Sequence, residues 1–258
     1  MTFSKKITAI VVPGLGFSSD YMDSILFQCS IDFNIIRFDL PGHCSNTENV
    51  IDVIDKIKSY IDDSYDNEKI ILIGWSIGGS IILKSIEDKN YKNNLSVLII
   101  EQSPKMINGR DWEYGLFGTL NENQVYDMFK KIKSNGKYML SQLIPNMIYS
   151  IDFSEKLKKY LATDINNNLV AELFKTVSYW DLRTVIYKTS LPICFIFSDH
   201  GLIYPKELYG YMLKYYSRPK NVHLIKRCGH ALFIEQSIYI SKIINKFIED
   251  NFYEVLYE

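Results

Sequence analysis

Short apolar runs alternate along the chain with longer amphipathic segments. Most of the runs are continuously apolar, which is typical of strands that helices bury on both faces. The expected strands are Ile7–Val12, Phe33–Phe38, Lys69–Gly74, Leu95–Ile100, Ile193–Phe197 and Val222–Ile225. The expected helices around them are Val50–Ile61, Ile77–Ile86, Pro205–Tyr216 and Ser237–Phe252. Strands and helices that alternate in this way predict an α/β fold with a mostly parallel central sheet flanked by helices.

The alternation stops between Ser103 and about residue 190, where the pattern is helical only. The helices expected there are Glu122–Ser134, Lys137–Tyr149, Ser154–Leu161 and Ile165–Ser178. Pro145 should kink or split the second of them, because proline removes a backbone donor and clashes with the preceding turn. The simplest interpretation is a helical cap over the carboxyl edge of the sheet. We therefore predict a core of residues 1–103 and 187–258 and an inserted cap of residues 104–186.

Composition excludes several classes of protein. The chain has 258 residues, of which 47% are hydrophobic and 23% charged, and its formal net charge is −1. This balance is that of a globular protein and does not suit nucleic acid or an anionic membrane as a partner. The apolar run Ile7–Val12 is too short for a signal peptide, and no stretch approaches the roughly 20 apolar residues of a membrane span. We expect a cytoplasmic protein without metal or cofactor, since its four cysteines show no zinc-site spacing.

Four lysines lie close together in the predicted cap, at positions 130, 131, 133 and 137. Two interpretations are open. The lysines form a small basic patch for an acidic partner, or they complement the dipole at the carboxyl end of a helix.

The strongest chemical signal is the motif Gly74-Trp-Ser76-Ile-Gly78-Gly, which directly follows a predicted strand and directly precedes a predicted helix. A sharp turn in this position lifts a serine hydroxyl above the edge of the sheet. It also requires small residues two positions before and two positions after the serine. We therefore expect Ser76 to be a catalytic nucleophile.

A serine nucleophile needs a base to accept its proton. Of the four histidines, His223 lies inside an apolar strand and His43 lies in a loop that we interpret as structural. His200 directly follows an acidic residue and is poorly placed to reach the same proton. His230 lies in a loop after the last strand, at the edge where active sites of open α/β sheets collect. His230 is therefore the expected base.

The base needs a carboxylate to orient it. Asp199 ends the strand before the one that precedes His230, which gives the chain order serine, acid, histidine. Glu101, at the end of Leu95–Ile100, is the competing acid. The two oxyanion donors expected from backbone geometry are the N–H groups of Leu15 and Ile77.

Together these residues resemble the α/β-hydrolase superfamily over nearly the whole chain. The segment Asp39-Leu-Pro-Gly-His43-Cys-Ser resembles its D-x-P-G-H-G-x-S loop, with Cys44 in place of the last glycine of that loop. The motif around Ser76, Trp180-Asp-Leu-Arg183 and Gly229-His-Ala-Leu-Phe233 are similar to small esterases of the pimeloyl-carrier-protein methyl esterase group. Glu101–Met106 and Asp111–Leu116 are instead similar to arylesterase and haloperoxidase-like relatives. The usual His-Gly of the oxyanion loop is Pro13-Gly14 here.

The resemblance implies a serine ester hydrolase that uses Ser76, His230 and Asp199 through an acyl-enzyme. Its substrate would be a small acyl ester or an acyl group linked to a carrier protein. The side chains expected to contact it are Trp75, Trp112, Phe117, Leu202 and Phe233. Three alternatives stay open: a thioesterase for carrier-bound acyl groups, a cofactor-free perhydrolase or haloperoxidase, and a binding protein without catalysis.

Overall fold

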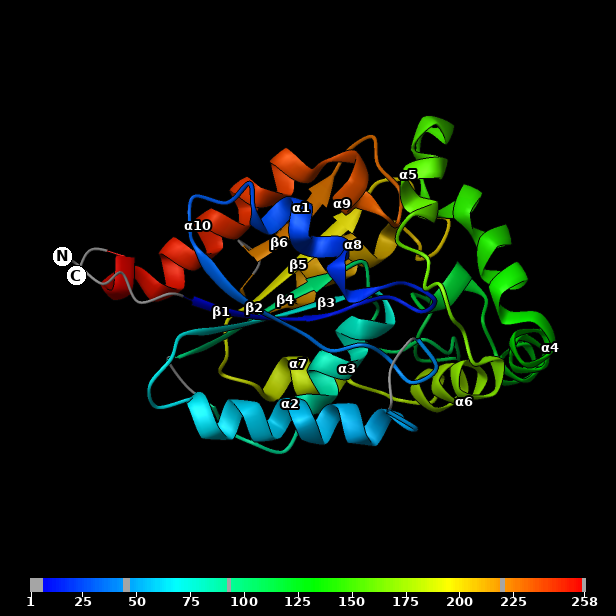
Figure 1. Cartoon of the computed structure of the whole chain (residues 1–258), viewed down its shortest axis with the longest axis horizontal. Coiled ribbons are helices and arrows are strands. Elements are labelled where there is room, and N and C mark those ends of the chain that lie inside the picture. Colours follow the sequence, from blue (N-terminus) through cyan, green and yellow to red (C-terminus); the bar gives the residue numbers. More distant parts are fainter. Residues whose placement is uncertain (1–6, 44–46, 92–93, 219–220, 257–258) are drawn as a thin grey trace.

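Six parallel strands form the central sheet in the described part of the chain (Figure 1). They are β1 (Ile7–Val12), β2 (Phe33–Arg37), β3 (Ile70–Trp75), β4 (Leu95–Ile100), β5 (Ile193–Ser198) and β6 (Val222–Ile225). Their order across the sheet is β2-β1-β3-β4-β5-β6. All six predicted strands are confirmed, with ends within one residue of the prediction. Every residue of β1, β3, β4 and β5 is buried, as a sheet covered on both faces requires.

The structure is a computed structural model, and it describes residues 7–43, 47–91, 94–218 and 221–256. Cys44 and Ser45, which belong to the loop motif noted above, lie outside these ranges.

Helices cover both faces of the sheet (Figure 1). The short 3-10 helix η1 (Ser19–Met22), α1 (Asp23–Leu26) and α10 (Ser237–Leu256) lie on one face, and α2 (Val50–Ser64), α3 (Ile77–Ser85) and α7 (Arg183–Lys188) lie on the other. The last two strands are followed by α8 (Glu207–Tyr215) and α9 (Leu232–Glu235). The predicted apolar stripe of α2 is buried, and Asn49 caps the start of the helix: its side chain accepts a hydrogen bond from the N–H of Asp52.

The segment between β4 and β5 is helical, as predicted, and the part of it that precedes α7 lies at one end of the sheet (Figure 1). We call residues 104–186 the cap. Its main elements are η2 (Leu116–Gly118), α4 (Glu122–Met147), η3 (Ile151–Phe153), α5 (Ser154–Lys158) and α6 (Asn167–Ser178). The backbone of α4 is interrupted at Asn135, where two separate helices were predicted to meet. The expected split at Pro145 is wrong: α4 runs through Pro145 and ends two residues later.

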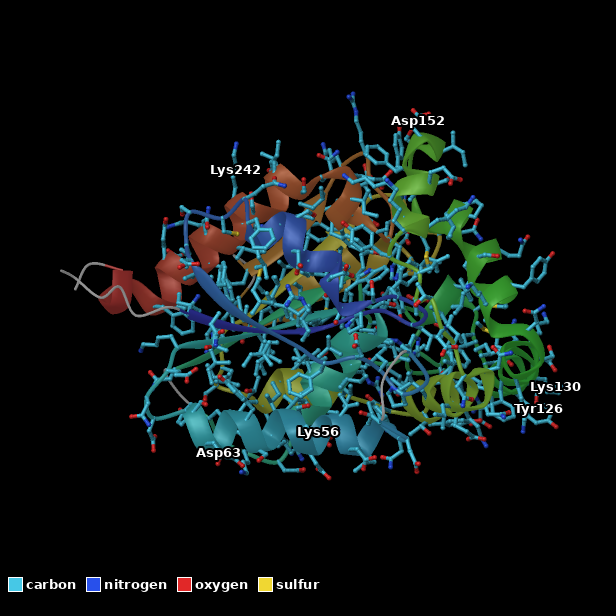
Figure 2. All side chains as sticks on the ribbon, in the orientation of Figure 1. Lys56, Asp63, Tyr126, Lys130, Asp152 and Lys242 are labelled. Atoms are coloured by element: carbon cyan, nitrogen blue, oxygen red, sulfur yellow. The ribbon has the colours of Figure 1, made fainter. Side chains whose placement is uncertain are left out.

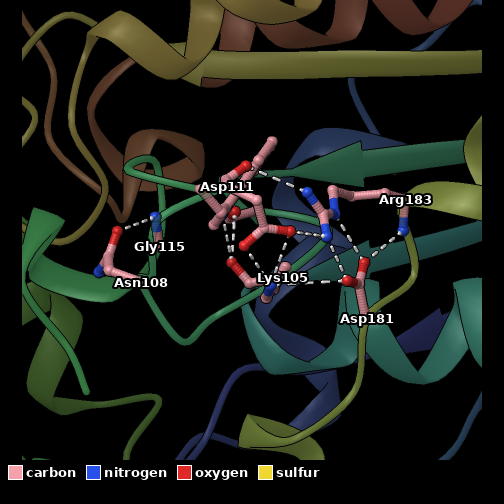
Figure 3. Close-up of polar contacts among 8 residues, drawn as sticks. Lys105, Asn108, Asp111, Gly115, Asp181 and Arg183 are labelled. Carbon is pink, nitrogen blue, oxygen red and sulfur yellow. Dashed lines mark hydrogen bonds and ion pairs between the residues drawn. The ribbon is translucent and has the colours of Figure 1, made fainter.

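The two segments that join the cap to the sheet are bound to each other (Figure 3). Lys105 and Asp181 form an isolated antiparallel bridge, and the N–H of Leu182 donates to the carbonyl of Pro104. Arg183 donates to both Asp181 and Asp111, at 2.8 Å from its Nε to Asp181 Oδ1 and 2.6 Å from its Nη2 to Asp111 Oδ2. Its guanidinium also lies over the ring of Trp112, 5.3 Å from the centroid. We call this group of residues the neck; the guanidinium lowers the pKa of Asp111 to about 2.

The loop after β2 connects the loop after β1 to the cap. His43 is 1% exposed, and its Nε2 accepts a hydrogen bond from the N–H of Gly16 at 2.6 Å. Since a backbone N–H can only donate, the ring proton of His43 lies on Nδ1, which is 2.9 Å from the carbonyl of Pro41. On its other side the loop forms a bridge with Ile165, and the N–H of Asn166 donates to Gly42. Burial lowers the pKa of His43 to about 4, so the imidazole is neutral at pH 7.

We expect Arg183→Ala to loosen the cap, because the substitution removes two ion pairs and the contact with Trp112 at once. Limited proteolysis should cut the variant faster than the wild-type protein within residues 104–186. High salt should reduce the difference in cleavage rate between the variant and the wild-type protein, because it screens these partly exposed ion pairs in the wild-type protein. The control is Lys130→Ala, which breaks an exposed pair with Asp127 within α4. Equal cleavage of the two variants would contradict the prediction.

His43 also predicts how stability changes with pH. Its pKa in the folded protein is below its unfolded value of about 6.5, so the unfolded chain binds the proton first. The contribution of neutral His43 to the free energy of unfolding is complete above about pH 6.5. As the pH falls towards 4, the free energy of unfolding decreases by up to about 1.4 kcal/mol per pH unit. His43→Gln keeps an acceptor for Gly16 but does not titrate.

Urea unfolding of both proteins at several pH values between 7 and 4 measures this effect. His223, whose pKa burial also lowers, contributes equally to both curves. The wild-type free energy of unfolding should fall more steeply than that of His43→Gln. Parallel curves would show that His43 is not the group that titrates.

Candidate active site

Ser76 lies on a strained turn between β3 and α3. Its backbone angles are φ 53° and ψ −131°, a combination that residues other than glycine rarely adopt. A Cβ on Gly74 would lie 2.6 Å from the carbonyl oxygen of Gly78, and a Cβ on Gly78 would lie 2.3 Å from that of Val12. The two glycines therefore allow the close approach that this turn needs, as the motif predicts.

His230 lies in the loop between β6 and α9 and is 2% exposed. Its carbonyl accepts a hydrogen bond from the indole N–H of Trp75 at 3.0 Å. The next residue, Ala231, donates its N–H to the carbonyl of Met147 at the end of α4, at 2.7 Å. The sheet and the cap therefore both hold the backbone around this histidine.

The carboxylate that meets His230 is Glu101. Its Oε2 lies 3.1 Å from Nδ1 of His230, and the two side chains are only 4% and 2% exposed. Glu101 directly follows β4 and adopts a left-handed φ of 51°. Its other carboxylate oxygen accepts a hydrogen bond from the N–H of Ser198 at the end of β5. The acid is thus bound to two neighbouring strands and to the histidine.

The expected contact between Asp199 and His230 is corrected by this geometry. Asp199 Oδ1 instead accepts a hydrogen bond from the N–H of Arg227 at 2.8 Å. Arg227 has a φ of 57° in the turn after β6. The short Asp199 side chain is used to close this turn, whereas the glutamate on the adjacent strand is one methylene longer and reaches the imidazole.

A cavity beneath the cap brings the predicted residues together. Ser76, His230, Leu15 and Ile77 all line it. In the described part of the chain, the N–H groups of Leu15 and Ile77 donate no hydrogen bond to other protein groups. They are therefore free to bind an oxygen that carries negative charge.

The predicted substrate contacts separate into two sets. Trp75 and Phe117 line the cavity. The other three do not: Trp112 is buried in the neck, Leu202 is 47% exposed, and Phe233 is buried behind Trp75, with 4.7 Å between ring centroids. Proximity to a motif in the chain is a poor guide to the direction of a large side chain, which explains why these three residues lie outside the cavity.

Two residues support the site from beside the cavity, and the first of them, Glu235, was not recognised in the sequence. Glu235 accepts hydrogen bonds from three backbone N–H groups, those of Tyr149, Ser150 and Gly229. It therefore ties the loop of His230 to the end of α4. The second is His43, which we interpreted as structural and which holds the N–H of Gly16 beside the expected oxyanion donor Leu15. An acidic residue in the helix that directly follows the histidine loop was the available signal for Glu235.

The cap lysines lie on the outer side of α4, where Figure 2 shows Lys130 and Tyr126. Lys130 pairs with Asp127 and lies 4.5 Å from the ring centroid of Tyr126. Lys133 lies over the ring of Phe129. These contacts within the cap agree with a solvated helix surface.

Among the described residues, no group of three or more histidine, cysteine or acidic side chains is placed to hold a metal ion. In the part of the chain that the structure describes, no helix is both long enough and apolar enough to cross a membrane.

Comparison with known proteins agrees with this architecture. Two curated relatives are pimeloyl-[acyl-carrier protein] methyl ester esterases. The one from Nitrosomonas europaea is 21% identical and aligns with 87% of this chain and 89% of its own. The one from Wigglesworthia glossinidia brevipalpis is 24% identical and aligns with 95% of each chain.

Solved structures show the same fold. A bromoperoxidase from Bacillus anthracis superimposes with a TM-score of 0.78 at 15% identity, covering 95% of this chain and 93% of its own. An esterase from Exiguobacterium antarcticum gives a TM-score of 0.76 at 15% identity, covering 95% and 92%. Residues 9–237 match the family described as the alpha/beta hydrolase family. The resemblance drawn from the motifs is thus confirmed, and the chain belongs to the alpha/beta hydrolase family.

Proposed function

We propose that the protein hydrolyses carboxylic esters through a covalent acyl-enzyme on Ser76, with His230 as the base and Glu101 as the acid that orients it. One observation carries the proposal. A serine on a strained, glycine-flanked turn shares a cavity with a histidine whose other nitrogen is bound to a buried carboxylate. This is the arrangement that nucleophilic acyl transfer requires.

In the first half of the reaction, Nε2 of His230 accepts the Ser76 proton while the serine oxygen attacks the ester carbonyl. The carbonyl oxygen becomes negatively charged and binds to the N–H groups of Leu15 and Ile77. When the tetrahedral intermediate collapses, the bond to the alcohol breaks and His230 returns its proton to the leaving oxygen. The products of this half are the free alcohol and an ester of Ser76.

In the second half, a water molecule takes the place of the alcohol. His230 accepts a proton from the water, the resulting hydroxide attacks the acyl carbon, and Ser76 leaves with the proton. The Ser76 hydroxyl makes no hydrogen bond to His230 in the structure. Catalytic hydrogen bonds of this kind often tighten only when substrate is bound.

Glu101 has a separate task. By accepting the Nδ1 proton of His230, it leaves Nε2 free to act as a base and stabilises the imidazolium that forms. The pair is shielded from water, so the interaction is stronger than it would be at the surface.

A second candidate substrate is an acyl ester linked to a carrier protein, and the names of the two curated relatives favour it. In this case the exposed lysines of α4 would contact the acidic carrier. Lys131→Glu and Lys137→Glu should then lower the rate on the carrier-linked ester and leave the rate on a free methyl ester unchanged. Equal rates on the carrier-linked ester before and after substitution would contradict the contact.

The choice of acid gives the sharpest test of the proposed mechanism. Glu101→Gln should lower kcat for p-nitrophenyl acetate by about 10³–10⁴, because the amide cannot hold the correct tautomer of His230. The glutamine retains an acceptor for the N–H of Ser198, so the fold should survive. Asp199→Asn retains the acceptor for Arg227 and should change kcat by at most a few-fold.

Ser76→Ala should lower the same rate by about 10⁴ or more, and a fluorophosphonate probe should label the wild-type protein at Ser76 only. Melting temperatures of all three variants control for misfolding. A large loss in Asp199→Asn together with a small loss in Glu101→Gln would return the role of the acid to Asp199. A p-nitrophenyl acetate rate that Ser76→Ala leaves unchanged would remove the serine from the mechanism.

A further inference from the structure

We infer that the cavity under the cap selects a short, uncharged acyl group of about two to four carbons. This inference rests on the proposed function and names the substrate class of the same site: a small free ester, which excludes the carrier-linked acyl ester as a substrate. It follows from three properties of the cavity: its size, the chemistry of its walls and the closure of the cap over it.

The cavity is small. Its volume is about 50 Å³, about a third of the roughly 150 Å³ of an apolar cavity that binds one benzene molecule. The space therefore suits a carbonyl group with a few carbons attached. The acyl group is the part of the ester that stays bonded to Ser76 after the alcohol leaves, so the cavity must hold it.

The walls are almost entirely apolar. The cap contributes Met106, Met128, Met139, Leu140, Leu143 and Met147. The polar side chains among the lining residues are Ser76, His230 and Tyr204, and the Tyr204 hydroxyl already donates to Gln102 Oε1 at 2.8 Å. Within this lining no lysine or arginine is present. A carboxylate at the far end of an acyl group would therefore be buried without a partner.

The cap closes tightly over the oxyanion loop. A Cβ placed on Gly16 would lie 2.4 Å from a methyl carbon of Leu140, and Leu140 is 1% exposed. The carbonyl of Met147 also binds the loop of His230. Longer acyl groups thus require the side chains of α4 to move, and the methionines among them are the most adaptable.

The first experiment measures kcat/KM for p-nitrophenyl esters of two, three, four, six, eight and ten carbons. The values should rise by up to about fourfold for each methylene that the cavity can bury and should fall beyond four carbons. Met139→Ala should shift the optimum to longer esters, and Leu143→Trp should confine activity to the acetyl ester. Tyr138→Ala, which alters an exposed neighbour of Met139, is the matched control and should leave the optimum unchanged.

The second experiment compares methyl butyrate with monomethyl succinate in a pH-stat at pH 7. Both acyl groups have four carbons and release methanol, but only the succinate carries a carboxylate. We expect kcat/KM to be at least about 100-fold lower for the succinate, since a buried unpaired charge is costly.

The outcomes separate the two proposals. The inference would be overturned, and the proposed ester hydrolase would stand, if Ser76 is labelled and p-nitrophenyl acetate is turned over but the chain-length or charge result differs. The differing results are rates that rise steadily to ten carbons and equal rates on the two methyl esters. Absence of turnover on every ester together with no labelling of Ser76 would overturn the proposed function itself.

Discussion

The proposed site of this protein depends on a hydrogen bond between two buried side chains, which joins Nδ1 of His230 to Oε2 of Glu101. A buried carboxylate without a partner is costly, so the imidazole and the N–H of Ser198 stabilise it together. The parallel sheet makes this meeting possible, because β4 lies between β3, which ends at the serine turn, and β5. The loop after β6 then brings the histidine back over these strand ends.

The cap is part of the site as well as its cover. The end of α4 binds the histidine loop through the carbonyl of Met147, and Glu235 binds the segment that follows α4. On the opposite side, the loop of His43 joins the oxyanion loop to the linker before α6. The neck secures the two chain segments that lead into the cap. The same short loops carry these contacts and the proposed catalytic groups, so a change in any of the contacts should also displace those groups.

Much of the fold could be predicted because it depends on local pattern. Strands buried on both faces have a continuous apolar signature, and the turn of Ser76 has its own sequence requirement. The acid could not be decided in this way, because Glu101 and Asp199 both directly follow a strand. The choice depends on the length of one side chain and on a turn at Arg227 that uses the other carboxylate. The directions of the Trp112 and Phe233 side chains likewise depend on packing between distant segments, which the local pattern of the sequence does not record.

A crystal structure of the protein inhibited by a small methyl alkylphosphonate ester tests the central claim most directly, because the adduct mimics the tetrahedral intermediate. We predict phosphorus bonded to the oxygen of Ser76, a phosphoryl oxygen within hydrogen-bond distance of the N–H groups of Leu15 and Ile77, and Glu101 bound to Nδ1 of His230. An adduct on another residue, or a His230 whose Nδ1 binds Asp199 in place of Glu101, would contradict this prediction.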